Sequence, residues 1–228
     1  MHNYAAYRLD DFDRKLSRAG FRPLDLLVCG PTGVGKSSTL NALLAANVAA
    51  CAGGAASCTQ EIASYELSEC LHIWDTPGLG DGVEQDLRFT TAIADCLRQT
   101  CMLGNRRIRR IDMALVLLEA RSRSLYTPIR LLKDILLPCL DASRIILAVN
   151  QADMALCGRH WDDDAMRPDN TLKATLEERT LTLWQRLRED TGQPLARPVF
   201  FSALHDFNLT ALLDVVLDRL PGTPRAIL

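Results

Sequence analysis

The sequence lacks paired cysteines. Its eight cysteines stand at positions 29, 51, 58, 70, 96, 101, 139 and 157, and no two of them form a Cys-x-x-Cys pair. Structural zinc sites usually use ligands about two to four residues apart, and the four histidines do not cluster near these cysteines. The spacing therefore argues against a zinc site or a disulfide framework. We expect free, buried thiols in a reducing compartment.

The sequence also lacks an excess of charge of one sign and a long apolar run. The formal net charge is −2, so no global basic field indicates binding to nucleic acid or anionic lipid. The apolar runs near 111–118 and 131–140 are too short to span a bilayer, and no basic start with an apolar stretch marks a secretory signal. We expect a cytoplasmic protein with no transmembrane segment.

What the sequence does contain is an alternation of two kinds of apolar segment. Short runs predict buried strands near 24–29, 62–67, 71–75, 111–118, 145–149 and 199–201. Longer stretches with helical spacing predict helices near 5–19, 36–46, 84–101, 127–137, 171–188 and 209–220. This order predicts an α/β fold with a mainly parallel sheet, whose ligands bind at the carboxyl ends of the strands. The stretch 157–170 is expected to be an insertion on that rim.

A glycine-rich turn follows the first expected strand. Residues 30–37 match the phosphate-binding motif G-x-x-x-x-G-K-[ST] in full, between a strand and a helix. Glycines let successive N–H groups curl around phosphate oxygens, and the helix N-terminus adds about half a positive charge. Lys36 is expected to reach the β- and γ-phosphates, Ser37 to ligate Mg²⁺ and Ser38 to contact the α-phosphate. The nucleotide-binding turn comprises Gly30, Pro31, Thr32, Gly33, Val34, Gly35, Lys36, Ser37 and Ser38.

Three further segments follow expected strands: Asp75-Thr76-Pro77-Gly78, Asn150-Gln151-Ala152-Asp153 and Ser202-Ala203. With them the sequence resembles the translation-factor class of P-loop GTPases. The resemblance implies that Asp75 holds Mg²⁺ through water and that the amide of Gly78 senses the γ-phosphate.

The same resemblance implies how the base is read. Asp153 would accept two hydrogen bonds from guanine, whereas adenine lacks that pair of donors and would leave the carboxylate unpaired. Asn150 would brace the phosphate-binding turn and the base. Gln151 stands where the family has lysine, and its stem would cover the base. The backbone of Ser202 and Ala203 would contact the guanine oxygen.

The loop 47–61 is expected to carry the threonine that ligates Mg²⁺ in the triphosphate state. Thr59 is the first candidate and Ser57 is the alternative. The predicted catalytic set is then Lys36, Thr59 and Gly78. The predicted metal ligands are Ser37, Thr59 and Asp75, and the cofactors are GTP or GDP with Mg²⁺.

Within this class, Cys58-Thr59, Asp75 to Gly80, the Asn150 segment and Asn208-Leu209 resemble the small bacterial YeeP/YfjP-type GTPases, relatives of the Era, TrmE and septin group. The resemblance implies a three-layer α/β/α P-loop G domain with a six-stranded, mainly parallel sheet and one antiparallel edge strand. We expect an N-terminal helical extension over 1–21, the G domain over 22–222 and a short tail over 223–228.

Leu79 stands where Ras-like enzymes carry the glutamine that orients the attacking water. A leucine cannot do so, and we expect a slow GTPase that takes this group from Glu84, Gln85, a partner or a second copy. The leading hypothesis is a GTP-hydrolysing switch. The alternative is a GTP- or GDP-binding, self-assembling module with negligible hydrolysis, while an ATP-using enzyme is opposed by Asp153.

Arginines on the expected nucleotide rim raise the question of self-association. Arg121 or Arg123 is a candidate arginine finger in a homodimer that forms across the nucleotide face, against the simpler interpretation of solvated loop arginines. The basic run 106–110 is expected to be a solvated loop, with contact to an acidic partner or a membrane surface as the alternative. The protein effector is left unknown.

Overall fold

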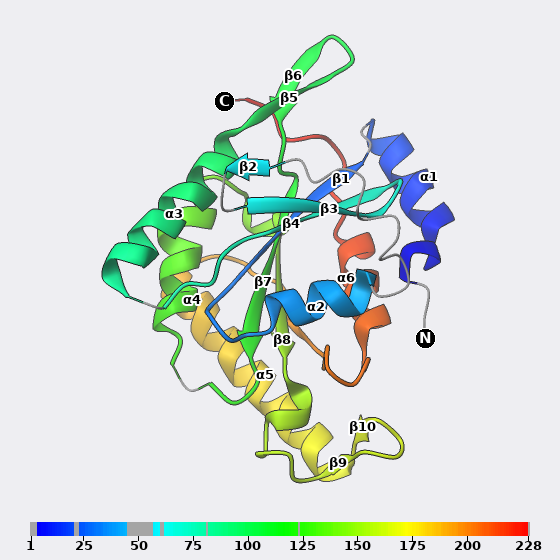
Figure 1. Cartoon of the computed structure of the whole chain (residues 1–228), viewed down its shortest axis with the longest axis vertical. Coiled ribbons are helices and arrows are strands. Elements are labelled where there is room, and N and C mark those ends of the chain that lie inside the picture. Colours follow the sequence, from blue (N-terminus) through cyan, green and yellow to red (C-terminus); the bar gives the residue numbers. More distant parts are fainter. Residues whose placement is uncertain are drawn as a thin grey trace.

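The computed structural model describes residues 4–20, 23–44, 57–59, 62–80, 82–122 and 124–227. A seven-stranded sheet crosses the molecule, and helices pack on both of its faces (Figure 1). In spatial order its strands are β11 (Val199–Phe200), β8 (Ile145–Asn150), β7 (Met113–Glu119), β1 (Leu24–Cys29), β4 (Leu71–Asp75), β3 (Ile62–Ser68) and β2 (Ser57–Thr59).

Pairing is parallel from β11 to β4. In the middle of the sheet, Leu26 of β1 lies opposite both Ile73 of β4 and Met113 of β7. Within this sheet, among the described strands, only β3 runs against the others, since it is antiparallel to β4 on one side and to β2 on the other. The prediction of a mainly parallel six-stranded sheet with one reversed strand is confirmed. The short strand β2 adds a seventh strand outside β3.

Two hydrophobic cores sandwich the sheet. One face is covered by α1 (Leu9–Ala19), α2 (Lys36–Leu44) and α6 (Leu209–Asp218). The other is covered by α3 (Val83–Arg98), α4 (Tyr126–Arg130) with the π-helical turn η3 (Leu131–Leu136), and α5 (Asn170–Thr191). Successive β1 residues point to opposite cores, Leu26 to the first and Leu27 to the second. Burial on both faces explains why these strands are continuous apolar runs in the sequence.

Short elements complete the chain. They are η1 (Tyr4–Ala6), η4 (Ala142–Arg144), η5 (Ala152–Met154), β9 (Trp161–Asp162) and β10 (Arg167–Pro168). The β9–β10 hairpin forms part of the stretch 157–170 that was expected to be an insertion. At the amino terminus, α1 buries Phe12 and Leu16 in the same core as α6. Near the other end of the chain, the carbonyl of Arg225 accepts a hydrogen bond from the amide of Arg109 at 2.9 Å.

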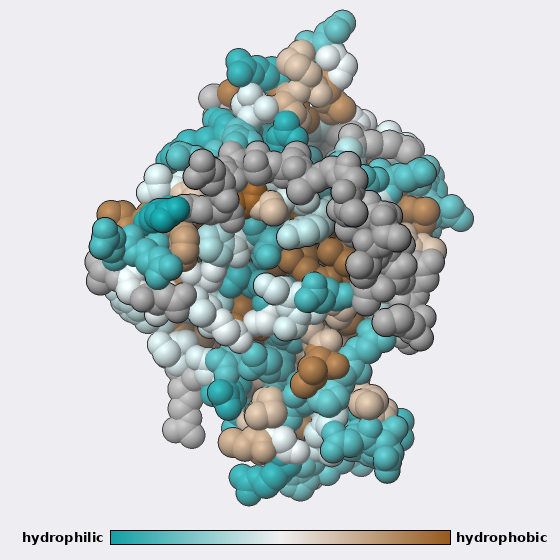
Figure 2. Space-filling view, in the orientation of Figure 1, coloured by the Kyte–Doolittle hydropathy of each residue, from teal (hydrophilic) through white to brown (hydrophobic). Residues whose placement is uncertain are grey.

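The basic run 106–110 corrects one expectation. It is not a solvated loop, because residues Arg106–Arg109 form β6, which pairs with β5 (Thr100–Leu103) in a hairpin that projects from the body (Figure 1). Gly104, at φ +58°, permits the turn, and Ile108 anchors the hairpin because its side chain is buried. The helix predicted over 84–101 therefore ends early. Figure 2 shows hydrophilic and hydrophobic residues side by side on this hairpin, where Met102 is 65% exposed.

The cysteines of the described residues are free thiols. Cys29, Cys70 and Cys96 are buried as expected, but Cys157 is exposed, so the prediction of burial is wrong there. In the same described ranges, no helix combines the length and the apolar character needed to cross a membrane.

Candidate nucleotide-binding site

The predicted site residues converge at the carboxyl ends of the parallel strands. The turn 30–35 joins β1 to α2, the segment 76–80 follows β4, the segment 151–154 follows β8, and the segment 202–208 follows β11. In Figure 1 the turn after β1 and the N-terminus of α2 lie at one edge of the sheet. The fold therefore brings together segments that are more than a hundred residues apart in the sequence, at the position where such sheets bind ligands.

The glycine-rich turn has the backbone that its motif requires. Gly33 and Gly35 have φ values of +78° and +88°, a region that other residues avoid. A Cβ on Gly35 would lie 2.4 Å from Nδ2 of Asn150, so glycine is needed for space as well. Helix geometry leaves the first amides of an α-helix without partners inside that helix, and such an end attracts anions. The helix α2 begins at Lys36, directly after the turn. The hydroxyl groups of Ser37 and Ser38 lie on exposed residues at this same helix end.

Lys36 lies folded over this turn. Its residue is only 8% exposed, and its Nζ donates to the carbonyls of Gly30 at 3.1 Å and Pro31 at 3.0 Å. An ammonium group held by two neutral carbonyls can exchange them for phosphate oxygens, which form stronger, charge-assisted hydrogen bonds.

Asp75 ends β4 beside the turn. One oxygen of its carboxylate, Oδ1, is buried and has no hydrogen-bond partner in the described part of the chain. Burial raises the pKa of Asp75 above its usual value, and the positive charge of Lys36 opposes this rise. Thr76 is fixed by its hydroxyl, which donates to the carbonyl of Val28 at 2.9 Å. A buried carboxylate oxygen that has no partner among the described residues is the kind of hard oxygen ligand that Mg²⁺ prefers.

The segment after Asp75 is paired with the glycine-rich turn. The amide of Thr32 donates to the carbonyl of Leu79 at 2.8 Å, and the amide of Leu79 donates to the carbonyl of Gly30 at 3.4 Å. A Cβ on Gly78 would lie 2.4 Å from Oγ1 of Thr32, so this position also requires glycine. The Leu79 side chain is 4% exposed and belongs to the core that contains Trp74. Leu79 is thus turned into the protein and cannot hold a water molecule.

Asn150 connects the glycine-rich turn to the segment that follows β11. Its Nδ2 donates to the carbonyl of Val34 at 2.9 Å, and its Oδ1 accepts from the amide of Ala203 at 3.1 Å. Gln151 supports the same contact, since its Nε2 donates to the carbonyl of Gly33 at 2.8 Å. Both amide side chains therefore hold the glycine-rich turn in place.

Asp153 lies in η5, three residues beyond Asn150. It is 4% exposed, and its Oδ1 is buried with no hydrogen-bond partner among the residues the structure describes. Its other oxygen, Oδ2, lies 3.8 Å from Nε2 of His205. A buried carboxylate oxygen without a donor is unfavourable unless a ligand supplies one.

Sequence reasoning missed His205 and Trp161. The two rings are in contact, tilted by 40° with centroids 4.8 Å apart, and Trp161 also makes an edge contact with Phe207 at 5.6 Å. Through them the β9–β10 hairpin packs against the segment that follows Ser202. No motif in the sequence marks either residue.

Two predicted groups stay untested. Thr59 lies in β2, but its side chain is outside the described part of the structure, as is the side chain of Ser57. Arg123 also lies outside the described residues. Arg121 is described: its side chain is 55% exposed and its Nε contacts Oε1 of Glu119 at 2.6 Å.

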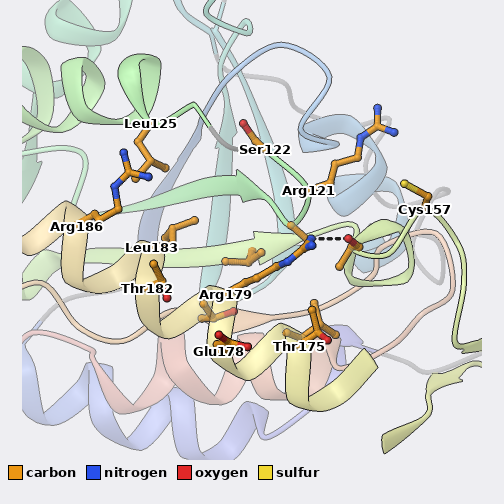
Figure 3. A pocket seen from close by; sticks show the side chains of 15 residues that line it. Arg121, Ser122, Leu125, Cys157, Thr175, Glu178, Arg179, Thr182, Leu183 and Arg186 are labelled. Carbon is orange, nitrogen blue, oxygen red and sulfur yellow. Dashed lines mark hydrogen bonds between the residues drawn. The ribbon is translucent and has the colours of Figure 1, made fainter. Parts of the chain in front are cut away.

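A cavity of about 750 Å³ lies beside the site rather than in it. It runs between the end of β7 and the helix α5, and Figure 3 shows Arg121, Arg179 and Arg186 around it. Arg179 reaches across to donate to the carbonyl of Ala155, as the dashed line in Figure 3 marks. None of the residues 30–38 lines this cavity.

Sequence comparison shows the family of the chain. A model of the 50S ribosome-binding GTPases matches residues 25–151. No curated protein matches the chain by sequence.

Solved structures share the fold. Toc33 from Arabidopsis thaliana in complex with GDP and Mg²⁺ superposes with a TM-score of 0.61 at 17% identity, over 96% of this chain and 93% of its own. Era in complex with MgGDPNP and nucleotides 1506–1542 of 16S ribosomal RNA gives a TM-score of 0.54 at 16% identity, over 88% of this chain. SelB from Methanococcus maripaludis with GppNHp gives 0.53 at 16% identity, again over 88%. The chain spans 58% of Era and 34% of SelB.

Proposed function

Because the chain belongs to the family of 50S ribosome-binding GTPases, we propose that it binds GTP and GDP with Mg²⁺ and hydrolyses GTP slowly, as a molecular switch. The observation that carries the guanine assignment is the buried Oδ1 of Asp153, which has no hydrogen-bond partner in the described part of the chain and lies just after β8, beside the Asn150 contact. Guanine offers its N1–H and its exocyclic amine to one carboxylate, and adenine offers no such pair. Binding of guanine would thus give this oxygen a donor.

The phosphates would lie over the start of α2. Lys36 would move from the carbonyls of Gly30 and Pro31 to the β- and γ-phosphates, and the amides of the turn would contact the remaining oxygens. Mg²⁺, when bound, would neutralise part of the phosphate charge. Ser37, Asp75 and Thr59 are the residues that we propose hold it.

Slow turnover follows from Leu79. The residue at this position is buried in the core and its backbone is tied to the glycine-rich turn, which leaves no side chain there to orient water. Glu84 and Gln85 lie exposed in the first turn of α3 and are the nearest candidates along the chain for this task. A switch with negligible hydrolysis, which assembles or changes partners with the bound nucleotide, is the second candidate. Release of phosphate in a single turnover separates the two.

The guanine assignment is tested by calorimetry with GDP and ADP in magnesium buffer. We expect GDP to bind and ADP to bind at least about a hundredfold more weakly, and Asp153→Asn to remove most of this preference. Asp163→Asn is the matched control, because Asp163 is an exposed aspartate of the insertion. No heat with GDP, or an unchanged base preference in Asp153→Asn, contradicts the proposal.

We also propose a finer placement with the small bacterial YeeP/YfjP-type GTPases and a cytoplasmic location. The support for the family placement is the motif set Cys58-Thr59, Asp75 to Gly80, Asn150 to Asp153 and Asn208-Leu209. Two further predictions stay predictions: the limits 22–222 of the G domain and the homodimer across the nucleotide face.

A further inference from the structure

The segment 202–208 presents the backbone of Ala203 to the site. It is closed by a pair of hydrogen bonds, each of 3.0 Å, between the backbones of Ser202 and Phe207. Asp206 and Asn208 both have positive φ, at +55° and +63°, and Nδ2 of Asn208 donates to the carbonyl of Phe200 at 2.7 Å. Asp and Asn adopt this conformation more readily than other residues do, and contacts from outside the segment add to the hydrogen bonds that hold its shape.

One such contact comes from the other end of the chain. The ring of Tyr4 is 4% exposed, and its hydroxyl donates to the carboxylate of Asp206. Burial and this hydrogen bond raise the pKa of Tyr4, so its hydroxyl keeps its proton and stays a donor. The contact joins residues that are 202 positions apart, and it meets the segment between Ala203 and Asn208.

The same N-terminal segment also contacts the phosphate side. Tyr4 lies in η1, which packs against α2, the helix that begins at Lys36. The residues after η1 contact α6. Tyr7, which precedes α1, donates to Asp214 at 3.1 Å, and Nζ of Lys15 in α1 donates to the carbonyl of Leu217 at 2.8 Å. Figure 1 shows α1 on the same side of the molecule as α2 and α6.

We propose that Tyr4 is a positioning residue of the nucleotide site: the N-terminal segment ties the segment 202–208 to α2 and thereby sets how long a guanine nucleotide stays bound. The inference rests on the proposed function. The hydroxyl of Tyr4 contacts Asp206, which lies outside both the glycine-rich turn and the segment of Asp153. It acts through Asp206 on the backbone that Asn150 holds at Ala203.

The test is the dissociation rate of a fluorescent GDP analogue from the full chain. Tyr4→Phe keeps the buried ring and removes only the hydroxyl. We expect its GDP dissociation rate to rise about threefold to tenfold, as the loss of one hydrogen bond to a charged group implies. Asp206→Asn takes the charge from the acceptor and should raise the rate as well, and the double variant should show less than the product of the two effects, because both changes weaken the same contact.

Tyr7→Phe is the matched control. It removes a hydroxyl from the same part of the chain, which donates to a carboxylate of α6 instead of the segment 202–208. We expect it to lower the thermal midpoint about as much as Tyr4→Phe while it leaves the dissociation rate unchanged. An unchanged rate in Tyr4→Phe overturns the inference, and so does an equal rise in both variants. Failure of the wild type to bind GDP would instead overturn the proposed function.

Discussion

Carboxyl groups lie at both ends of the central sheet. Asp25 and Asp112 are buried at the amino ends of β1 and β7, whereas the half-buried Asp75 is the last residue of β4 and the buried Asp153 follows β8. At the amino end the protein supplies donors: Trp74 donates to Asp25 at 2.7 Å, and the amide of Asp25 donates to Asp112 at 3.1 Å. At the carboxyl end, Asp75 and Asp153 each keep an oxygen with no donor among the described residues.

An unpartnered oxygen alone does not identify a functional acid. Oδ1 of Asp112 is also buried without a hydrogen-bond partner in the described part of the molecule. Burial raises the pKa of Asp112 to about 7, so this group can lose its charge at neutral pH. The difference lies in the surroundings. The carboxyl end has Lys36, a helix N-terminus and glycines that leave room, whereas the amino end is packed for stability.

The largest effect should come from removing the cation at the carboxyl end. Lys36→Ala leaves no ammonium group for the phosphates, and we expect GTP affinity to fall about a hundredfold or more. Calorimetry measures the affinity, and circular dichroism should show an unchanged fold. Lys173→Ala, on the exposed side of α5, is the control and should bind as the wild type does. Equal affinity in Lys36→Ala would remove the distinction between the two ends.

A second experiment separates the steric clash of an added Cβ from the cost of a positive φ. Gly35 and Gly20 have similar φ values, +88° and +78°, but a Cβ meets Asn150 only at Gly35. We expect Gly20→Ala to lower the free energy of unfolding by about 1 kcal/mol and Gly35→Ala by about 3 kcal/mol. Urea denaturation measures both values. Gly35→Ala should also weaken GDP binding, and similar losses in both variants would show that the site is less tightly packed than described.

At the amino end of the sheet, the contribution of Asp112 to the free energy of unfolding should depend on pH. The pKa of Asp112 is near 3.9 in the unfolded chain and about 7 in the folded one, so the folded state holds this proton more tightly. Its contribution to stability is complete below about pH 4 and is lost as pH rises to about 7. Arg144 and Arg225 oppose the rise of this pKa, and Asp25 adds to it.

Asp112→Asn removes this titration. Relative to the wild type, the variant should be about as stable at pH 4.5 and more stable at pH 8, by about 1–2 kcal/mol in urea denaturation. The exposed Asp163→Asn controls for a change in net charge and should show no such trend. A difference between Asp112→Asn and the wild type that does not vary with pH would contradict the assignment of Asp112 as a buried, neutral acid.

The smallest effect is expected from replacing Arg121, which follows β7 on the rim of the proposed nucleotide site. The pair between Arg121 and Glu119 is largely exposed, so Arg121→Ala should not change the thermal midpoint. If two copies meet across their nucleotide faces, GTP turnover per protomer should rise severalfold with the concentration of wild-type protein and stay level in Arg121→Ala. A level line for the wild type eliminates Arg121 as an arginine finger.

Much of the fold could be predicted from the sequence, because the central strands are buried on both faces and leave continuous apolar runs such as 24–29 and 145–149. The glycine-rich turn could be found too, since local backbone conformation and close packing require its glycines. The β5–β6 hairpin could not be predicted, because its one buried residue, Ile108, stands among four arginines and gives no apolar pattern. His205, Trp161 and Tyr4 were missed for a different reason. Their contacts depend on the tertiary fold and leave no local pattern.

The Asn150 side chain faces two ways at once, with its amide nitrogen toward Val34 and its amide oxygen toward Ala203. A side-chain amide carries a donor and an acceptor on one planar group, whereas aspartate would repel the first carbonyl and leucine would satisfy neither loop. An engineer who exchanged Asp153 to alter the proposed base preference would therefore have to leave Asn150 alone. That one side chain keeps two loops from distant parts of the sequence in a fixed relative position.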